Sequence, residues 1–199
     1  ADEYYHQGSI WIEGRSGNRY TVDITNHTNS RALFIVSVDG LDVLKGKTAG
    51  PESDGYVVNP HSTLSIPGWK LNDTEAAEFF FSRSYDSYVN SIGGSTANTG
   101  VIGAMVFSER AYHASVMAWN GYPAGYASGA ISANMVRSMQ ASKSMLSAST
   151  ASLPLNAISQ DVGTGFGAAT NWSTTTTSFA KADPNNPDTI MAIYYNTAK

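Results

Sequence analysis

The side chains of this chain that most often carry acid–base or metal chemistry are its four histidines. His6, His27, His61 and His113 each stand alone, and no two are spaced to share a helix face as the zinc ligands of a His-Glu-x-x-His motif do. A hydrolase serine needs small residues on both sides for a sharp strand-to-helix turn, and no Gly-x-Ser-x-Gly run occurs. Cysteine is absent, which excludes disulfides, thiolate catalysis and cysteine-ligated metals. A metal site assembled across strands stays open as an alternative.

Four carboxylates have positions that suggest chemistry. Asp39 and Asp42 flank Gly40 and offer oxygens of the kind that Ca²⁺ binds, but the calcium loop with its alternating oxygen ligands is absent. An ordinary Asp-Gly turn is therefore favoured. Asp86 and Glu109 have the residue types of a glycoside hydrolase pair, whose mechanism depends on the separation of the two carboxyl groups. Because the sequence does not supply that separation, we assign neither residue a role.

A glycine-rich block, Gly163-Thr164-Gly165-Phe166-Gly167, superficially looks like a phosphate-binding loop. It lacks the Lys-Ser/Thr ending of a P-loop and the full glycine spacing of a dinucleotide-binding turn. A turn or a close approach of backbones is the favoured interpretation. The sequence therefore predicts no catalytic residue, no cofactor and no metal site, and we expect a protein that is not an enzyme. An enzyme whose site forms only in the folded chain is the remaining alternative.

Aromatic side chains offer a different chemistry, because sugar rings stack on their faces and protein interfaces use them as anchors. Several Trp and Tyr residues lie in or beside predicted loops. For Trp11 and Trp69 the plainer interpretation is packing in the core. The residues selected as interaction candidates are Trp11, Trp119, Tyr122, Tyr126, Trp172 and Thr175, the last because it lies in a β-branched run that is short of charge.

The charge and composition of the chain limit its partners. Charged residues make up 14% of the 199 residues, the net charge is −4, and the 12 Lys and Arg residues are scattered. Without a basic stripe, no nucleic-acid partner is expected. No apolar run approaches the roughly 20 residues that span a bilayer, so no transmembrane segment is predicted. The neutral polar composition and the Ala1 start, which suits cleavage after a small residue, favour a processed protein that is secreted or displayed on the cell surface.

The elements that must position these residues are predicted to be strands. Runs rich in β-branched and aromatic residues alternate with turn signals, which favours an all-β antiparallel sandwich, jelly-roll-like or immunoglobulin-like, in a single domain over 1–199. We place the main sandwich strands in 8–110. Residues 101–107 are apolar on both faces and are predicted to form a central strand.

Two hairpins are expected in the first half of the chain. One pairs 9–12 with 19–25, since glycines and polar residues separate two β-rich runs. The other pairs 33–38 with 41–44 across an Asp-Gly dipeptide, which is a strong turn signal. Because 33–38 is apolar almost throughout, we expect that strand to be covered on both faces.

Charge nearly disappears in the next part of the chain. Residues 111–162 are rich in Ala, Ser, Gly and Met, and we expect a low-charge excursion or linker there. Within it, 134–146 is either a short helix, since methionines recur at helical spacing, or part of a flexible connector. Residues 163–199 recover β character and are expected to return to the sheet, with a hairpin between 173–179 and 190–195.

Short blocks of the chain follow one another in a distinctive order. They are Gly-Asn-Arg-Tyr at 17–20, Ser-Val-Asp-Gly-Leu-Asp-Val-Leu at 37–44, Gly-Tyr-Val-Val at 55–58, Ile-Pro-Gly-Trp at 66–69, Gly-Val-Ile-Gly at 100–103, Gly-Thr-Gly-Phe-Gly at 163–167 and Ile-Tyr-Tyr at 193–195. In this order the chain resembles a family of uncharacterised exported proteobacterial proteins. The resemblance covers about 14–110 and 163–196, implies bacterial export and carries no activity. It departs at Leu71-Asn72 and Ala168-Ala169, where relatives tend to have charged residues, so a site that used those charges is not expected.

The function that these observations favour is a non-enzymatic exported structural or adhesive protein. Such a subunit of a surface filament or matrix would form homo-oligomers or polymers through strand edges or terminal segments. The runs 9–12 and 173–179 lack the charges that protect strand edges, and each is expected to pair either with a neighbouring copy or within its own chain. The alternative function is a carbohydrate-binding module that uses exposed Trp and Tyr side chains to bind a glycan.

Overall fold

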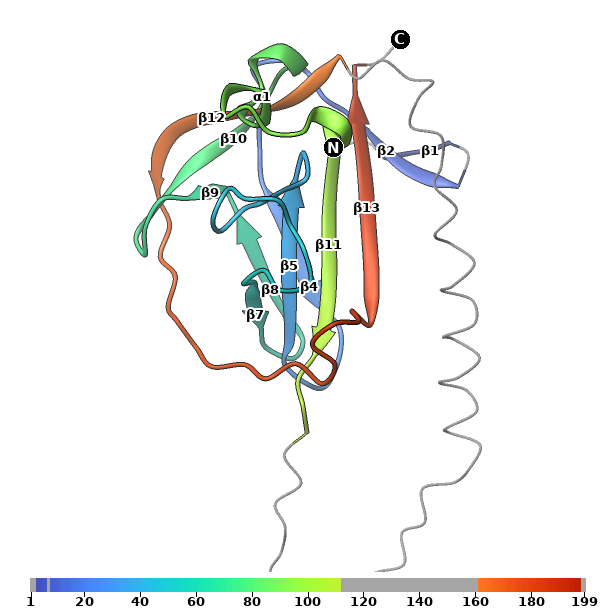
Figure 1. Ribbon diagram of the computed structural model, residues 1–199, viewed down its shortest axis with the longest axis vertical. Coiled ribbons are helices and arrows are strands. Elements are labelled where there is room, and N and C mark those ends of the chain that lie inside the picture. The colour runs from blue at the N-terminus through green and yellow to red at the C-terminus, as the bar shows by residue number, and fades with distance from the viewer. Residues whose placement is uncertain (1–2, 7, 112–160, 198–199) are drawn as a thin grey trace, which may run out of the picture. The chain divides into compact units, whose positions relative to one another are not determined.

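The computed structural model describes residues 3–6, 8–111 and 161–197. In this part of the chain nearly all regular structure is β-strand, and the strands form two layers around one main apolar core (Figure 1). The predicted all-β sandwich is thereby confirmed. The larger layer contains, in spatial order, β1 (Glu3–His6), β2 (Ser9–Glu13), β13 (Thr189–Asn196), β11 (Val101–Ser108), β5 (Ala32–Val38) and β6 (Leu41–Asp42), with β7 (Tyr56–Val58) also paired to β5.

The second layer is built from a four-stranded sheet and a separate strand pair. The four-stranded sheet contains β12 (Val162–Asn171), β10 (Glu75–Arg83) and β3 (Arg19–Tyr20), with β9 (Gly68–Lys70) also on β10, and the pair is β4 (Val22–Asn26) with β8 (Ser62–Ile66). Side chains from both layers meet in the core, where Phe79 of β10 and Val38 of β5 are fully buried.

The only described helices lie between β10 and β11. They are the 3₁₀ turn η1 (Ser84–Asp86), the short helix α1 (Tyr88–Ser91) and the 3₁₀ turn η2 (Thr96–Asn98). None of these helices is long and apolar enough to cross a membrane. They cluster at one end of the sandwich, beside the start of β12 (Figure 1).

The centre of the larger sheet matches its prediction. β11 lies between β5 and β13, and in its register with β5 the pairs Ile102–Val38 and Ala104–Val36 face the main core. The alternate residues of the two strands face the other way, where Ile35 packs with Phe107 in a second apolar cluster. β5 is therefore covered on both faces, which explains its almost unbroken apolar sequence.

The hairpin of β5 with β6 is also confirmed. Val38 pairs with Leu41, so Asp39 and Gly40 form the connecting turn. Both have positive φ, 52° and 80°, as a tight turn between twisted strands requires. Asp and Gly tolerate this left-handed conformation better than other residues, and the Asp-Gly dipeptide therefore specifies the turn.

The predicted hairpin of 9–12 with 19–25 is wrong. β2 lies between β1 and β13, and its pairing with β13 is parallel. The run 19–25 divides into β3, which pairs with β10, and β4, which pairs with β8 in the other layer. The glycines and polar residues between the two runs do end β2, as expected. The chain then crosses to the second layer instead of reversing within one sheet.

The predicted C-terminal hairpin is wrong for a similar reason. Residues 173–179 have no regular structure, and 190–195 belongs to β13, which inserts between β11 and β2. β12, which precedes the irregular run, pairs with β10 in the second layer. Threonine-rich composition permits extended backbone, but it does not supply a partner strand.

The glycine block at 163–167 lies inside β12, so the turn interpretation is wrong and the close-packing interpretation is confirmed. A Cβ on Gly165 would lie 2.2 Å from the Phe80 ring, and one on Gly167 would lie 2.6 Å from the Glu78 carbonyl oxygen. The excursion expected at 111–162, including the helix at 134–146, falls almost wholly outside the described residues, and the single domain over 1–199 stays a prediction.

Candidate interaction sites

Strand β1 forms a free edge of the larger sheet. Its four residues are all exposed, and within the described chain it pairs only with β2. Tyr4 and Tyr5 point to opposite faces of the strand and are 54% and 77% exposed. The edge contains no Lys, no Pro and no register shift, which are common ways of protecting an exposed strand, and its only protections are its short length and the charge of Glu3. A second strand could therefore pair with β1 and cover both tyrosines.

An aromatic row runs from this edge across one face of the sheet. Tyr4 lies opposite Trp11 in the β1–β2 register, and Trp11 lies opposite Tyr194 in the β2–β13 register. The Trp11 and Tyr194 rings stack with centroids 5.0 Å apart and planes at 28°. The buried Trp11 indole nitrogen has no hydrogen-bond partner among the described residues. Trp11 is thus half-buried in a row that connects the interior of the sheet to its exposed edge.

A cleft of about 670 Å³ opens between the two layers close to β2, β3 and β4. Its lining includes the apolar Ile12, Phe81 and Ile193 and the charged Glu13, Arg15 and Arg19. Arg15 pairs with Glu13 at 2.9 Å, and Arg19 pairs with Glu78 at 3.1 Å. The hydrogen bond from Arg15 lowers the pKa of Glu13, so this carboxylate is not a proton donor near neutral pH. Both arginines at the cleft are therefore already paired with carboxylates of the protein.

A chain of buried hydrogen bonds connects the two layers below this cleft. Tyr195 donates to Asp39 Oδ1 at 2.5 Å. Since the phenol has only one proton, Thr164 donates to Tyr195 and Tyr20 donates to Thr164, both at 2.6 Å. The other donors to Asp39 are the backbone N–H groups of Gly100 and Thr164, at 2.8 and 2.7 Å. Every acceptor oxygen of Asp39 is therefore used by the protein itself.

Burial shifts the pKa values of the ionisable groups in this hydrogen-bonded series. It raises the pKa of Asp39, while the hydrogen bonds from Tyr195 and the backbone act in the opposite direction. Burial also raises the pKa values of Tyr20 and Tyr195 well above their usual range. Asp39 is only 1% exposed, so no substrate reaches it, and the arrangement is suited to structural support. From the sequence, Asp39 was interpreted as a turn residue, with a calcium ligand as the disfavoured alternative. Its Tyr and Thr partners lie far from it in the sequence, so no local pattern indicated that these side chains would form one site.

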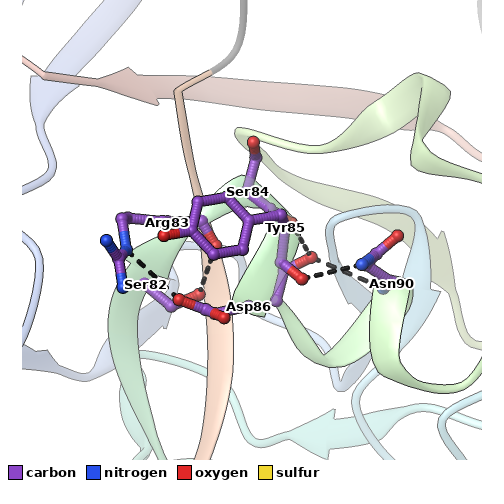
Figure 2. Close-up of polar contacts among 7 residues, drawn as sticks. Ser82, Arg83, Ser84, Tyr85, Asp86 and Asn90 are labelled. Atoms are coloured by element: carbon purple, nitrogen blue, oxygen red, sulfur yellow. Dashed lines mark hydrogen bonds and ion pairs between the residues drawn. The ribbon is translucent and has the colours of Figure 1, made fainter.

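A second hollow, of about 290 Å³, lies in the loop between β10 and β11 and is lined by Ser84, Tyr85, Asn90, Thr96 and Thr99. Figure 2 shows the polar contacts beside it. The Arg83 guanidinium bonds to Asp86 at 3.2 Å and lies 4.7 Å from the centre of the Tyr85 ring. Asn90 donates from Nδ2 to the Tyr85 carbonyl oxygen at 2.7 Å. Neutral polar groups and one aromatic ring thus surround this hollow, which the sequence did not reveal.

The interaction candidates chosen from the sequence lie in different environments in the structure. Trp172 packs edge-on against Tyr56, with ring centroids 5.5 Å apart, and donates to the Ser65 carbonyl oxygen at 3.1 Å. It therefore supports the core. Thr175 is exposed, but in irregular chain. Trp69, expected in the core, is 3% exposed and donates to the Gly165 carbonyl oxygen. The candidates outside the described residues are Trp119, Tyr122 and Tyr126.

The carboxylates that the sequence suggested for catalysis or calcium binding each have a partner of their own. Asp86 bonds to Arg83, and Glu109 accepts from Arg31 Nε at 2.9 Å. Asp42 is 2% exposed and accepts from the Leu44 backbone N–H at 2.7 Å. No group of His, Asp and Glu side chains in the described part of the chain could hold a metal ion. Asp86 and Glu109, which have the residue types of a glycoside hydrolase pair, are thus each bound to a different arginine.

Comparison with known proteins finds no family model, no curated protein and no solved structure that matches this chain. Any functional conclusion therefore depends on the chemistry of the sites described above.

Proposed function

We propose that this protein is an exported, non-enzymatic structural or adhesive subunit that associates with copies of itself through the free edge of β1. The observation that carries the proposal is that edge, with its unpaired outer side in the described chain and its two exposed tyrosines. Strand addition uses backbone hydrogen bonds for affinity and alternate side chains for specificity. Tyr4 and Tyr5 would supply side-chain contacts on both faces of the added strand.

The edge of the second layer is a weaker candidate. β12 is longer and contains no charged residue, but its register with β10 shifts between Ala77 and Phe79, and irregularities of this kind disfavour pairing with another chain. Near its start, the Thr164 N–H is already bonded to Asp39. β1 has neither obstacle, and its aromatic row continues into the sheet through Trp11.

Two further observations support the proposal. The Arg15 guanidinium lowers the pKa of Glu13 at the larger cleft and holds it ionised, and the two buried carboxylates whose pKa is raised by burial, Asp39 and Asp42, are almost closed to solvent. These are the properties of a supporting framework more than of a reactive centre. Export is inferred from the charge-poor, Ser-, Thr- and Tyr-rich composition and from the resemblance carried by the sequence blocks.

Assembly is tested by analytical ultracentrifugation of the full chain over a range of concentrations, together with electron microscopy of native material. We expect the wild type to form larger species as concentration rises. Tyr5→Lys places a charge on the free edge at a side chain that is 77% exposed, and we expect it to shift the protein to monomer without changing the circular dichroism spectrum or the melting temperature.

Thr175→Lys is the matched control, since it adds the same charge at an exposed position in chain without strand structure. We expect this variant to assemble like the wild type. If Thr175→Lys prevents assembly and Tyr5→Lys does not, the contact lies in 173–179 and not at β1. A wild-type protein that stays monomeric at every concentration, with no polymer in native material, would exclude self-association altogether.

A further inference from the structure

The loop that forms the hollow between β10 and β11 is stabilised by hydrogen bonds and by one buried side chain. Ser87 is fully buried, donates from Oγ to the Ser84 carbonyl oxygen at 2.6 Å and accepts from the Asn90 backbone N–H. Val89, 1% exposed, anchors α1 in the main core. The Asn90 side chain then ties the helix to the Tyr85 carbonyl oxygen (Figure 2). The backbone of this loop and the Asn90 side chain are therefore held in place before any ligand arrives, which lowers the entropy cost of binding.

One hydroxyl of the hollow has no protein partner. Thr99 is 2% exposed, and its Oγ1 is buried without a hydrogen bond among the described residues. Buried polar groups in native proteins are almost always hydrogen-bonded, so an exception calls for an explanation. Thr99 lines the hollow, and rotation of its side chain about χ1 would turn the hydroxyl toward a ligand bound there. Nothing in the proposed assembly through β1 uses it.

The charge balance beside the hollow selects for a neutral ligand. The five lining residues carry no formal charge. The nearest charged pair, Arg83 and Asp86, is joined by a hydrogen bond of 3.2 Å, so the two charges largely cancel. An anionic ligand would have no unpaired cation to bind among these residues, and a cationic ligand would have no unpaired carboxylate.

The hydroxyl groups and the aromatic ring around the hollow are those that sugar-binding sites use. Hydroxyls from Ser84, Thr96 and Thr99 can each donate and accept, and so can the hydroxyls of a sugar. Tyr85 is 59% exposed at the rim, where its ring offers an apolar face for the C–H side of a pyranose. Arg83 packs on this ring and restricts its movement. A volume of about 290 Å³ suits one sugar ring better than an extended oligosaccharide.

We infer that the hollow lined by Ser84, Tyr85, Asn90, Thr96 and Thr99 binds one neutral pyranose residue of a glycan. The site lies on a different loop from the β1 edge and involves none of the residues of that edge. A subunit of this kind would bind sugar at one place and copies of itself at another. With one ring bound in an open hollow, the affinity is expected in the millimolar range.

The first test is titration of the ¹⁵N-labelled full chain with neutral methyl glycosides of common hexoses, followed by NMR. Shifts that saturate and concentrate in residues 84–99 support the inference. Tyr85→Ala removes the stacking face and is expected to weaken binding at least tenfold. Thr99→Val keeps the shape of the side chain and removes only the hydroxyl, and it is expected to weaken binding several-fold with an unchanged or higher melting temperature.

The two outcomes for Thr99 separate a binding role from a structural one. A purely structural Thr99 would lower the melting temperature in the Val variant and leave glycoside affinity as in the wild type, and this result would overturn the inference. So would the absence of saturable shifts with every neutral glycoside, or a preference for charged sugars. Tyr5→Lys is the control for assembly, since it should leave glycoside binding intact, whereas Tyr85→Ala should leave assembly intact. Failure of one proposal is therefore distinguishable from failure of the other.

Discussion

The hydroxyl of Tyr195 donates a 2.5 Å hydrogen bond to Asp39, a residue 156 positions away in the sequence. Both side chains are buried, one on β13 and the other in the turn between β5 and β6. Through Thr164 and Tyr20 the same chain of hydrogen bonds continues into β12 and β3, so it joins strands of both layers. This polar connection through the core leads to the first prediction.

Tyr195→Phe should destabilise the protein by about 1 to 3 kcal/mol, because it leaves the buried Asp39 carboxylate and the Thr164 hydroxyl each without one partner. Chemical denaturation of both proteins measures the difference in the free energy of unfolding. Tyr194→Phe is the neighbouring control: Tyr194 is half-buried, and its ring stacking on Trp11 survives the change. We expect less than about 0.5 kcal/mol for the control. Equal effects of the two substitutions would contradict a special role for the Tyr195 hydroxyl.

The ionisation of Asp39 should make stability depend on pH in a particular direction. Burial raises its pKa in the folded protein, so Asp39 binds a proton more tightly there than in the unfolded chain. The contribution of this group to stability is then complete below its ordinary pKa and is lost as pH rises through the raised value. Asp39→Asn, which cannot titrate and tolerates the positive φ, removes this dependence. The difference in unfolding free energy between wild type and Asp39→Asn is therefore expected to vary with pH in that window, and a difference independent of pH would refute the assignment.

Gly68 should not tolerate a side chain. A Cβ at this position would lie 1.8 Å from the Ala77 carbonyl oxygen, which belongs to the paired strand and cannot move aside. Gly68→Ala is expected to cost about 3 kcal/mol or more, measured by thermal or chemical unfolding. Gly50→Ala is the matched control, because its nearest contact is the Glu52 carboxylate end at 3.9 Å. A Gly68→Ala protein as stable as the control would show that β9 does not approach β10 as described.

Val36 and Val106 share the main core and provide a test of the central strands. Val36 is 2% exposed on β5, and Val106 is half-buried on β11 against the same cluster. Truncation of either to Ala should destabilise by roughly 1 to 3 kcal/mol, with the larger effect at Val36, because burial is lost and a cavity remains. Melting temperatures of the two variants give the comparison. No change in either would mean that these strands are not central.

Local sequence chemistry was sufficient for those parts of the fold that depend on neighbours in the chain. The Asp39-Gly40 turn and the hairpin that it closes follow from the backbone preferences of two adjacent residues. The apolar run at 101–107 likewise predicted a central strand, because only a strand covered on both faces can be apolar on both. The glycines at 163–167 left a turn and close packing as alternatives, and the structure shows close packing against β10.

Strand partners were decided by tertiary structure alone. The alternation of residues shows which side chains share a face, but it does not show which strand lies alongside, and so the parallel pairing of β2 with β13 was not predicted. The same holds for β12, which joins the second layer, and for Trp172, which became part of the core. Asp39 shows the limit most clearly: its sequence neighbours define a turn, whereas its burial and its bond to Tyr195 arise only when distant segments exclude water around it. The sequence determines local backbone preference. Burial exists only once the chain has folded, and it is burial that changes pKa values and creates sites.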